Sequence, residues 1–343
     1  MEKYFSSTIC SNGYCTCFNK IYKDDPSSKV FIVNGTDYEK SVFFAEIEKL
    51  FHGYNIAVFN PFYDECIDGI FIKNLNTYII SDGGYNKISP ILSAQWENQI
   101  TISQKNFDSK LIHQLIVGKQ NENNLYRQAC GNLKKAGFVK ERIHKEISPH
   151  LNEDKILALI MKLCRKFKGK NDNNKSEIKL LSSPTPLGFH THYDTIFSLC
   201  DEFININDDT GFISSIVLGV VKNCAIKKGI QIVGCPQYFN NKIYQFLLFP
   251  KLKTGICTTD FCHILPFEAS YNVNSTEFIK ENKESDKKVK TLLSVEEKFL
   301  KKAILSLYAG REERFKYNDL IKGYMEPDKA QECAKQLAER ILN

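Results

Sequence analysis

The sequence predicts an α/β fold with two tandem domains, each a parallel sheet covered by helices on both faces and followed by a helical lobe. Short β-branched and aromatic runs alternate with amphipathic segments, a pattern typical of parallel sheets. The second half also repeats the first at a nearly constant separation. A period this long indicates duplicated domains and not a solenoid.

The repeat is visible in three places that occur in the same order in both halves. Ser7, Gly13 and Thr16 recur as Ser182, Gly188 and Thr191; Leu75, Thr77 and Ile79 recur as Leu252, Thr254 and Ile256; and Ala129, Leu133, Ile147, Asp154, Lys155 and Leu163 recur as Ala303, Leu307, Ile321, Asp328, Lys329 and Leu337. A chain of 343 residues is long enough for two domains that each bury a core. We place the first domain at 1–170 and the second at 171–343, joined by an Asn- and Lys-rich linker at 169–176.

The elements of the first half follow from local pattern. It predicts strands at 29–33, 54–59, 77–81 and 99–103, and a helix at 40–51. The second half repeats this plan, with strands at 202–206, 231–234 and 254–258 and a mostly buried helix at 213–226. Helical tails follow at about 120–168 and 292–342, with turns near Ser148-Pro149 and Glu326-Pro327. Any ligand site is expected at the carboxyl ends of the strands.

Composition excludes several classes of protein. The longest apolar stretch, Gly211–Val221, is too short to cross a bilayer, so we expect no membrane partner. Met1–Phe5 lacks the pattern of a secretory signal, which predicts a cytoplasmic location and reduced forms of the twelve cysteines. The net charge of +6 comes from mixed-sign stretches such as Lys280–Lys290, so there is no strong nucleic-acid signal.

The segment after the first strand resembles a damaged phosphate-binding loop. An intact loop reads GxxxxGK[ST], because glycines let backbone amides surround the phosphates, the lysine reaches them and the hydroxyl binds magnesium. The first half offers Asn34, Gly35, Thr36, Asp37, Tyr38, Glu39, Lys40 and Ser41 at these positions. We therefore expect Asn34, Gly35, Thr36 and Lys40 near phosphate, and Ser41 with Asp82 near magnesium. Glu39 would put a carboxylate beside the phosphate site.

The second copy of the loop has lost more of the pattern. Residues 207–214 carry Phe212 in place of the second glycine and Ile213 in place of the lysine. Asp208 and Asp209 bring two further acids to the same place. The sequence therefore predicts that the scaffold has been kept while its phosphate chemistry has been lost.

These motifs resemble a bacterial family of tandem-duplicated P-loop ATPase-like proteins, over nearly the whole chain. The matching residues are Gly13-Tyr14, Phe18-Asn19, Lys40-Ser41, Asp68-Gly69, Ile79–Gly83, Leu133, Ala136 and Asp154 in the first half, and Thr185–Phe189, Tyr193-Asp194, Pro250, Leu252 and Tyr324-Met325 in the second. The resemblance implies a P-loop NTPase-like fold in each half, with ATP and magnesium as cofactors and ATP hydrolysis as the activity. This chain departs from the family at the glycines of both loops and the lysine of one.

A metal site is an alternative that the repeat suggests. Cys15 and Cys17 of the first half align with His190 and His192 of the second, and the four side chains would suit tetrahedral zinc if an internal twofold axis brought them together. The competing interpretation is that all four are core substitutions on strands. A metal-hydrolase site built on His190, His192 and Asp194 would need further His and Asp ligands at later strand ends, and the only later histidine is His263.

Three functional hypotheses follow from the sequence. The first is a pseudo-ATPase that acts as a scaffold or regulatory subunit for an unidentified protein partner, which would make the chain not an enzyme. The second is residual nucleotide binding, or slow ATP hydrolysis, in the first half alone with ATP and magnesium. The third is a nucleic-acid- or metal-binding module on the same fold, since aromatic and basic residues interleave at 308–324.

Overall fold

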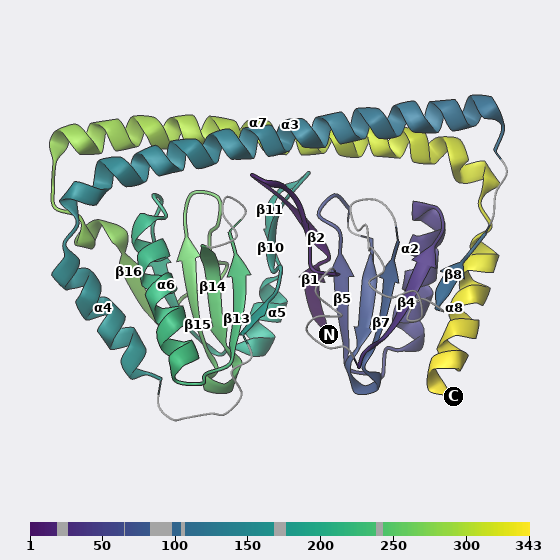
Figure 1. Cartoon of the computed structure of the whole chain (residues 1–343), viewed down its shortest axis with the longest axis horizontal. Coiled ribbons are helices and arrows are strands. Elements are labelled where there is room, and N and C mark those ends of the chain that lie inside the picture. Colours follow the sequence, from purple (N-terminus) through teal and green to yellow (C-terminus); the bar gives the residue numbers. More distant parts are fainter. Residues whose placement is uncertain (19–26, 65, 83–97, 104–106, 168–175, 238–242) are drawn as a thin grey trace.

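The computed structural model describes residues 1–18, 27–64, 66–82, 98–103, 107–167, 176–237 and 243–343. Two six-stranded sheets stand side by side, and a pair of long helices spans both of them (Figure 1). The predicted α/β class with two similar halves is confirmed at this level. The expected linker at 169–176 lies outside the described residues except for Ser176, as do the domain boundary at 170 and the residues Asn19 and Gly83.

The two sheets have the same strand order. The first, β1-β5-β6-β7-β4-β8, contains β1 (Glu2–Phe5), β5 (Ile56–Asn60), β6 (Gly69–Ile72), β7 (Thr77–Ser81), β4 (Lys29–Asn34) and β8 (Gln99–Thr101). The second, read from the equivalent edge as β9-β13-β14-β15-β12-β16, contains β9 (Ser176–Ile178), β13 (Ile232–Pro236), β14 (Tyr244–Phe249), β15 (Thr254–Thr259), β12 (Glu202–Asn207) and β16 (Tyr271–Asn274). The internal repeat is thus a repeat of topology.

Both sheets are mixed, which corrects the expectation of wholly parallel sheets. β6 runs antiparallel to β5 and β7, and β14 runs antiparallel to β13 and β15, while the other neighbours are parallel. A tight turn between β6 and β7 allows the reversal, because Asn76 adopts a left-handed φ of 46° that asparagine tolerates well. Lys253, the repeat equivalent of Asn76, takes a φ of 52° at the corresponding turn between β14 and β15.

Helices cover the outer face of each sheet, but the inner faces differ from the expectation. The outer helices are α2 (Asp37–Leu50) and α8 (Pro327–Leu342) on the first sheet, and α4 (Glu153–Arg165) and α6 (Phe212–Lys227) on the second (Figure 1). The inner faces share one apolar cluster, in which Phe59 and Ile80 of the first sheet join Phe203 and Val233 of the second. The short helix α5 (Tyr193–Leu199) contributes to the same cluster.

The helical tails are exchanged between the halves. α4 follows the first half in sequence, yet Ile156 and Leu163 lie in the core of the second half with Val217 of α6. α8 ends the chain, yet Leu337 packs in the core of the first half with Phe44 of α2. Each tail has one apolar stripe, which is buried against the sheet of the other half. The two halves of the sequence are therefore not the two packing units.

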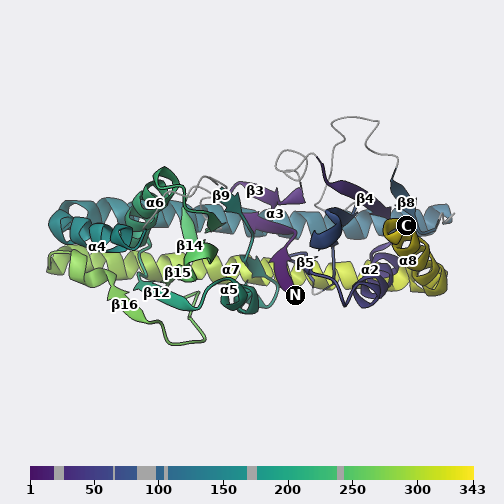
Figure 2. The same cartoon turned by 90° about the horizontal axis from the view of Figure 1, so that it is seen from below.

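The long helices α3 (Ser109–Ile147) and α7 (Lys283–Ile321) run side by side across the whole molecule (Figure 2). Small residues bring them close, because a Cβ added at Gly310 would lie 2.2 Å from Cε1 of Tyr126. Ala129 and Leu133, and their repeat equivalents Ala303 and Leu307, are fully buried here. The turns expected after these helices are present as the 3-10 helices Ser148–His150 and Lys322–Tyr324.

Two β-hairpins meet at the centre of the molecule, beneath the helix pair. They are β2 (Ser7–Cys10) with β3 (Gly13–Thr16), and β10 (Ser182–Thr185) with β11 (Gly188–Thr191). The hydroxyls of Thr8 and Ser183, which are repeat equivalents, lie 2.7 Å apart. Repeat-equivalent residues of the two halves therefore contact each other at the centre of the molecule.

Candidate functional site

The loop at 34–36 connects β4 to α2 at the carboxyl end of the first sheet, where the sequence predicts a ligand site. Thr36 is the N-cap of α2, with extended backbone angles of φ −70° and ψ 160°. Its hydroxyl accepts a hydrogen bond from the Glu39 backbone N–H at 3.3 Å, which begins the helix at Asp37. Asn34 is the last residue of β4, and Gly35 lies against the Ile102 side chain.

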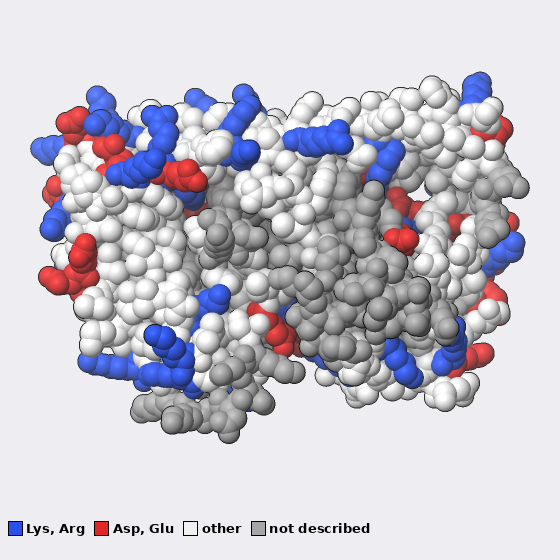
Figure 3. Space-filling view, in the orientation of Figure 1, with Lys and Arg blue, Asp and Glu red and all other residues white. Residues whose placement is uncertain are grey.

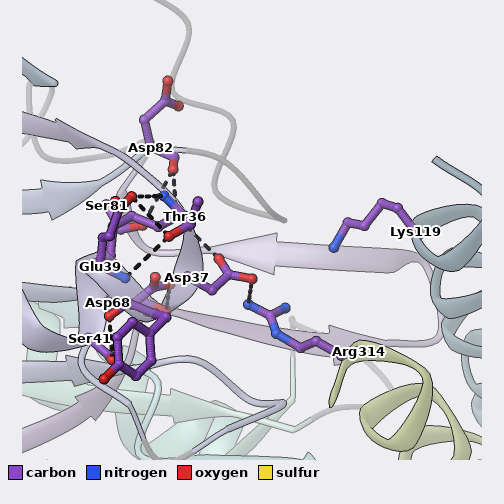
Figure 4. Close-up of polar contacts among 12 residues, drawn as sticks. Thr36, Asp37, Glu39, Ser41, Asp68, Ser81, Asp82, Lys119 and Arg314 are labelled. Carbon is purple, nitrogen blue, oxygen red and sulfur yellow. Dashed lines mark hydrogen bonds and ion pairs between the residues drawn. The ribbon is translucent and has the colours of Figure 1, made fainter. Parts of the chain in front are cut away.

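The Glu39 carboxylate lies at the N-terminus of α2. Its Oε2 accepts hydrogen bonds from the backbone N–H and the hydroxyl of Thr36 at 3.2 and 2.9 Å, which completes a capping box (Figure 4). Its Oε1 accepts a third from the Ser103 hydroxyl at 2.7 Å. Glu39 is fully buried. The chain thus supplies its own anion to the end of the helix that attracts anions.

Lys40 points toward the end of β7. Its Nζ donates to the backbone carbonyl oxygen of Asp82 at 3.0 Å and lies 3.4 Å from Oδ1 of Asp37. The Ser41 hydroxyl instead donates to the Tyr38 carbonyl oxygen one turn back in α2, at 2.7 Å. In Figure 4 the Asp82 carboxylate points away from Ser41. The structure therefore brings Lys40 to Asp82 but does not bring together the two side chains expected to bind magnesium.

Arg314 reaches this loop from α7, on the other half of the sequence. Its guanidinium lies 2.6 Å from Oδ2 of Asp37 (Figure 4). It also lies 3.3 Å from Oε1 of Glu122 on α3, and it stacks on the ring of Tyr63. Lys119 also bonds to Glu122, at 2.6 Å. Burial alone would raise the pKa of Asp37, but Arg314, Lys40 and Lys119 hold it below its usual value.

A second buried carboxylate, Asp68, lies beside this cluster. It accepts a hydrogen bond from the Ser6 hydroxyl at 2.8 Å and is 5% exposed. Burial raises the pKa of Asp68, although Lys40 opposes the shift. The cluster therefore combines buried charges, among them Glu122, Asp68 and Arg314, with half-buried ones, and the buried charges depend on their partners.

The equivalent loop of the second half is also closed by a carboxylate. Asp208 Oδ2 accepts the backbone N–H of Ser214 in the first turn of α6 at 2.8 Å, and Oδ1 accepts the Thr210 hydroxyl at 2.6 Å. Asp208 is 2% exposed. Ile213, which replaces the lysine of the loop pattern, is buried in the apolar core. Phe212 stacks on His144 of α3, with ring centroids 4.6 Å apart.

Lys140 of α3 approaches this second loop as Arg314 approaches the first. Its Nζ lies 3.0 Å from Oε1 of Glu296 on α7. In the repeat, Glu296 is the equivalent of Glu122 and Arg314 is the equivalent of Lys140, so the two buried ion pairs correspond to each other. Burial would lower the pKa of Lys140, but Glu296 and Asp260 raise it.

Sequence reasoning missed both of these ion pairs. The constant offset between the two helical tails could have linked Glu122 to Glu296 and Lys140 to Arg314. It could not have shown that Arg314 crosses to the first loop, because that contact depends on how α3 and α7 pack. The capping pattern Thr36-x-x-Glu39 was also a usable signal, since it predicts that the carboxylate folds back onto the helix.

The four residues considered for zinc do not form a common cluster. Cys15 Sγ lies 3.3 Å from Sγ of Cys10, and Cys17 Sγ donates to the Phe5 carbonyl oxygen at 3.6 Å. His190 and His192 lie against each other and against the ring of Phe5. Among the described residues, no group of three or more metal-binding side chains is placed to hold an ion.

His190 and His192 line a cavity of about 490 Å³ between the halves, with Arg311 of α7 at its edge. Nε2 of His192 is buried there without a hydrogen-bond partner. Burial, helped by His190 and Lys3, lowers the pKa of His192 to about 3. His192 is therefore a neutral imidazole at physiological pH.

Comparisons with family models, with curated proteins and with solved structures found no match for this chain. Within the described part of the chain, no helix has both the length and the apolar character that a membrane span requires. In Figure 3, lysine and arginine side chains along the helix pair have acidic side chains beside them in several places. The geometry of the two loops is therefore the main guide to function.

Proposed function

We propose that this protein is a pseudo-ATPase: two P-loop NTPase-like halves kept for their shape, acting as a scaffold or regulatory subunit for a protein partner. One observation carries the proposal. In both halves, the helix N-terminus that would receive phosphate already binds a buried carboxylate of the chain, Glu39 in the first and Asp208 in the second.

Electrostatics supports this interpretation of the first loop. A carboxylate about 4 Å from a bound phosphate weakens phosphate binding by roughly 4 kcal/mol at an effective dielectric constant near 20. That energy corresponds to about a thousandfold in affinity. Lys40 does not offset it freely, because its ammonium group is already paired with Asp37 and with the Asp82 carbonyl oxygen.

The second loop supports the proposal through its shape and its charge. Phe212 stands where the phosphate pattern requires a glycine, and Ile213 stands where it requires a lysine. The nearest buried cation is Lys140, whose Cε would lie 3.3 Å from a Cβ at Gly211, and it is paired with Glu296. A triphosphate would have to break that ion pair and displace Asp208.

The decisive experiment is calorimetric titration with ATP and Mg²⁺, together with an assay of ATP hydrolysis. The proposal expects neither binding heat nor turnover, and the Lys40→Ala variant should give the same result. Magnesium-dependent hydrolysis that Lys40→Ala abolishes would overturn it. Circular dichroism should show that the variant is folded.

A second candidate function is nucleotide binding by the first half alone, and the retained Lys40 favours it, because its Nζ still reaches the end of β7. On this view Glu39 only weakens the site. Glu39→Gln should then strengthen ATP binding by up to about a thousandfold. Glu48→Gln, on the same helix, is the control and should change nothing. If Glu39→Gln bound ATP no more tightly than the wild type, or if neither bound it, the result would count against this candidate.

A further inference from the structure

Cys10 and Cys15 form a close pair of thiols at the end of the β2–β3 hairpin. In the strand register Cys10 faces Gly13 and Cys15 faces Thr8, so the two cysteines are diagonal neighbours across the hairpin. Their Sγ atoms are 3.3 Å apart. A disulfide bond is about 2.05 Å long, so closure needs an approach of only about 1.2 Å. The Cα atoms of diagonal neighbours lie about 7–8 Å apart, so closure also needs a small inward shift of the hairpin backbone.

The surroundings of Cys10 favour its thiolate. The hydrogen bond from the Cys15 thiol, opposed by burial and helped by the backbone amides of Asn12 and Gly13, lowers the pKa of Cys10 to about 7. Other cysteines of the chain behave in the opposite way. Burial raises the pKa of Cys130 to about 11 and that of Cys235 to about 11. A thiolate at neutral pH is the reactive form of cysteine.

The position of the pair allows a small oxidant to reach it. Cys15 is half-buried, Cys10 is 8% exposed, and Asn12 at the turn between them is exposed. The hairpin also lies at the junction of the two halves, since Thr8 bonds to Ser183 of the other hairpin. A covalent bond here would fix the part of the chain where the halves meet.

We propose that Cys10 and Cys15 are a modification site, at which hydrogen peroxide converts the paired thiols into a disulfide within the hairpin. The Cys10 thiolate attacks one peroxide oxygen, the O–O bond breaks, and with one proton the products are a sulfenic acid and water. The Cys15 sulfur then attacks the Cys10 sulfur and displaces the hydroxyl group, which leaves as water after taking the Cys15 proton. In total, two thiols and one peroxide give one disulfide and two waters.

The chain contains a matched control pair. The thiols of Cys164 on α4 and Cys224 on α6 are also hydrogen-bonded, but burial raises the pKa of Cys164 to about 12. At pH 7 about half of Cys10 is ionised, against roughly one part in 10⁵ of Cys164. The lower nucleophilicity of a less basic thiolate reduces this difference, which leaves an advantage of roughly 10²-fold for Cys10.

The test is stepwise oxidation of the fully reduced protein with hydrogen peroxide at pH 7. Free thiols are blocked with N-ethylmaleimide, and disulfides are located by peptide mass spectrometry. The Cys10–Cys15 disulfide should form first, roughly 10²-fold faster than any Cys164–Cys224 disulfide. Earlier oxidation of Cys164 and Cys224, or no disulfide between Cys10 and Cys15, would overturn the proposal.

Two variants and a pH series separate the steps. Cys15→Ser should leave a sulfenic acid on Cys10 that dimedone traps. Cys10→Ser should leave Cys15 unmodified. The rate of Cys10 alkylation by iodoacetamide should reach half its maximum near pH 7 in the folded protein and near pH 9 in urea. A folded midpoint near pH 9 would contradict the inference even if both variants fold poorly.

Discussion

Arg314 shows how strongly single residues of this protein depend on distant ones. It neutralises Asp37 from α2 and Glu122 from α3, and its own side chain is 2% exposed. A buried carboxylate without its cation keeps the cost of losing water but loses the compensating attraction. The stability of the first loop is therefore tied to a residue near the other end of the chain.

We predict that Arg314→Met destabilises the protein by about 2–3 kcal/mol, because buried Glu122 and half-buried Asp37 both lose their guanidinium. Among the described residues, they keep only Lys119 and Lys40 as cationic partners. Urea unfolding followed by circular dichroism measures the change. Lys316→Met, two residues along the same helix at an exposed position, is the control and should unfold like the wild type. Equal stability of Arg314→Met and wild type would contradict this, and would mean that Lys40 and Lys119 alone are enough to compensate Asp37 and Glu122.

The lowered pKa of His192 makes the stability of the folded protein depend on pH. Its pKa is about 3 in the folded protein and about 6.5 in an ordinary environment, so the unfolded chain takes up a proton between these values and the folded protein does not. Stability should therefore fall as pH drops from about 6.5 toward 3. The share of this loss that His192 causes by pH 5 is roughly 1–2 kcal/mol, after allowance for its partial exposure.

The measurement compares urea unfolding at pH 7 and pH 5 for wild type and His192→Gln. Other titrating groups act equally in both proteins, so the variant should lose less stability between the two pH values. His52→Gln, at an exposed position, should keep the wild-type dependence. If wild type and His192→Gln lost the same unfolding free energy between pH 7 and pH 5, the His192 imidazole would have an ordinary pKa in the folded protein.

At the scale of elements, strands with strong local patterns could be predicted. The expected strand at 77–81 is β7 itself, and those at 29–33 and 254–258 differ from β4 and β15 by one residue. β6 and β14 were not predicted. β6 has only four residues, and the tight turns that make both strands antiparallel depend on left-handed Asn76 and Lys253, of which only Asn76 is a usual turn residue.

The long helices α3 and α7 show that the first residue of a helix is hard to predict from sequence. The expected tails begin near 120 and 292, but α3 begins at Ser109 and α7 at Lys283. The first turns of α7 are charged and mostly exposed, so their sequence does not distinguish a helix from an exposed loop. Their helical form depends on the Asn282 cap, whose side chain accepts the backbone N–H groups of Glu284 and Ser285.

The position of the candidate site could be predicted from sequence, but only the local part of its geometry could. Lys40 and Glu39 lie at the start of the helix that follows the expected strand, as local pattern indicates. The contact of the Glu39 carboxylate with Thr36 follows from the local capping pattern, whereas its contact with Ser103 comes from the segment after β8. Contacts between segments this far apart in sequence are set by packing and not by spacing.

At the scale of the whole molecule, the exchange of α4 and α8 makes the halves interdependent. Without α8, the outer face of the first sheet would lose the buried side chains Leu337 and Ile341, along with three alanines. Each large side chain contributes about 1.5–3 kcal/mol by burial. The α3–α7 pair adds a shared core, since Leu133 and Leu307 are both fully buried in it.

We therefore predict that fragments 1–170 and 171–343 do not fold stably alone but assemble when mixed. Each fragment alone would expose an apolar sheet face and should bind a hydrophobic dye, whereas the mixture should form a one-to-one complex with the circular dichroism of the intact chain. Native mass spectrometry measures the stoichiometry. The intact chain cut at a protease site engineered into 168–175 is the control and should stay associated. Cooperative unfolding of fragment 1–170 as a monomer would contradict the exchange, because a half that folds alone has no need of α8 from the other half.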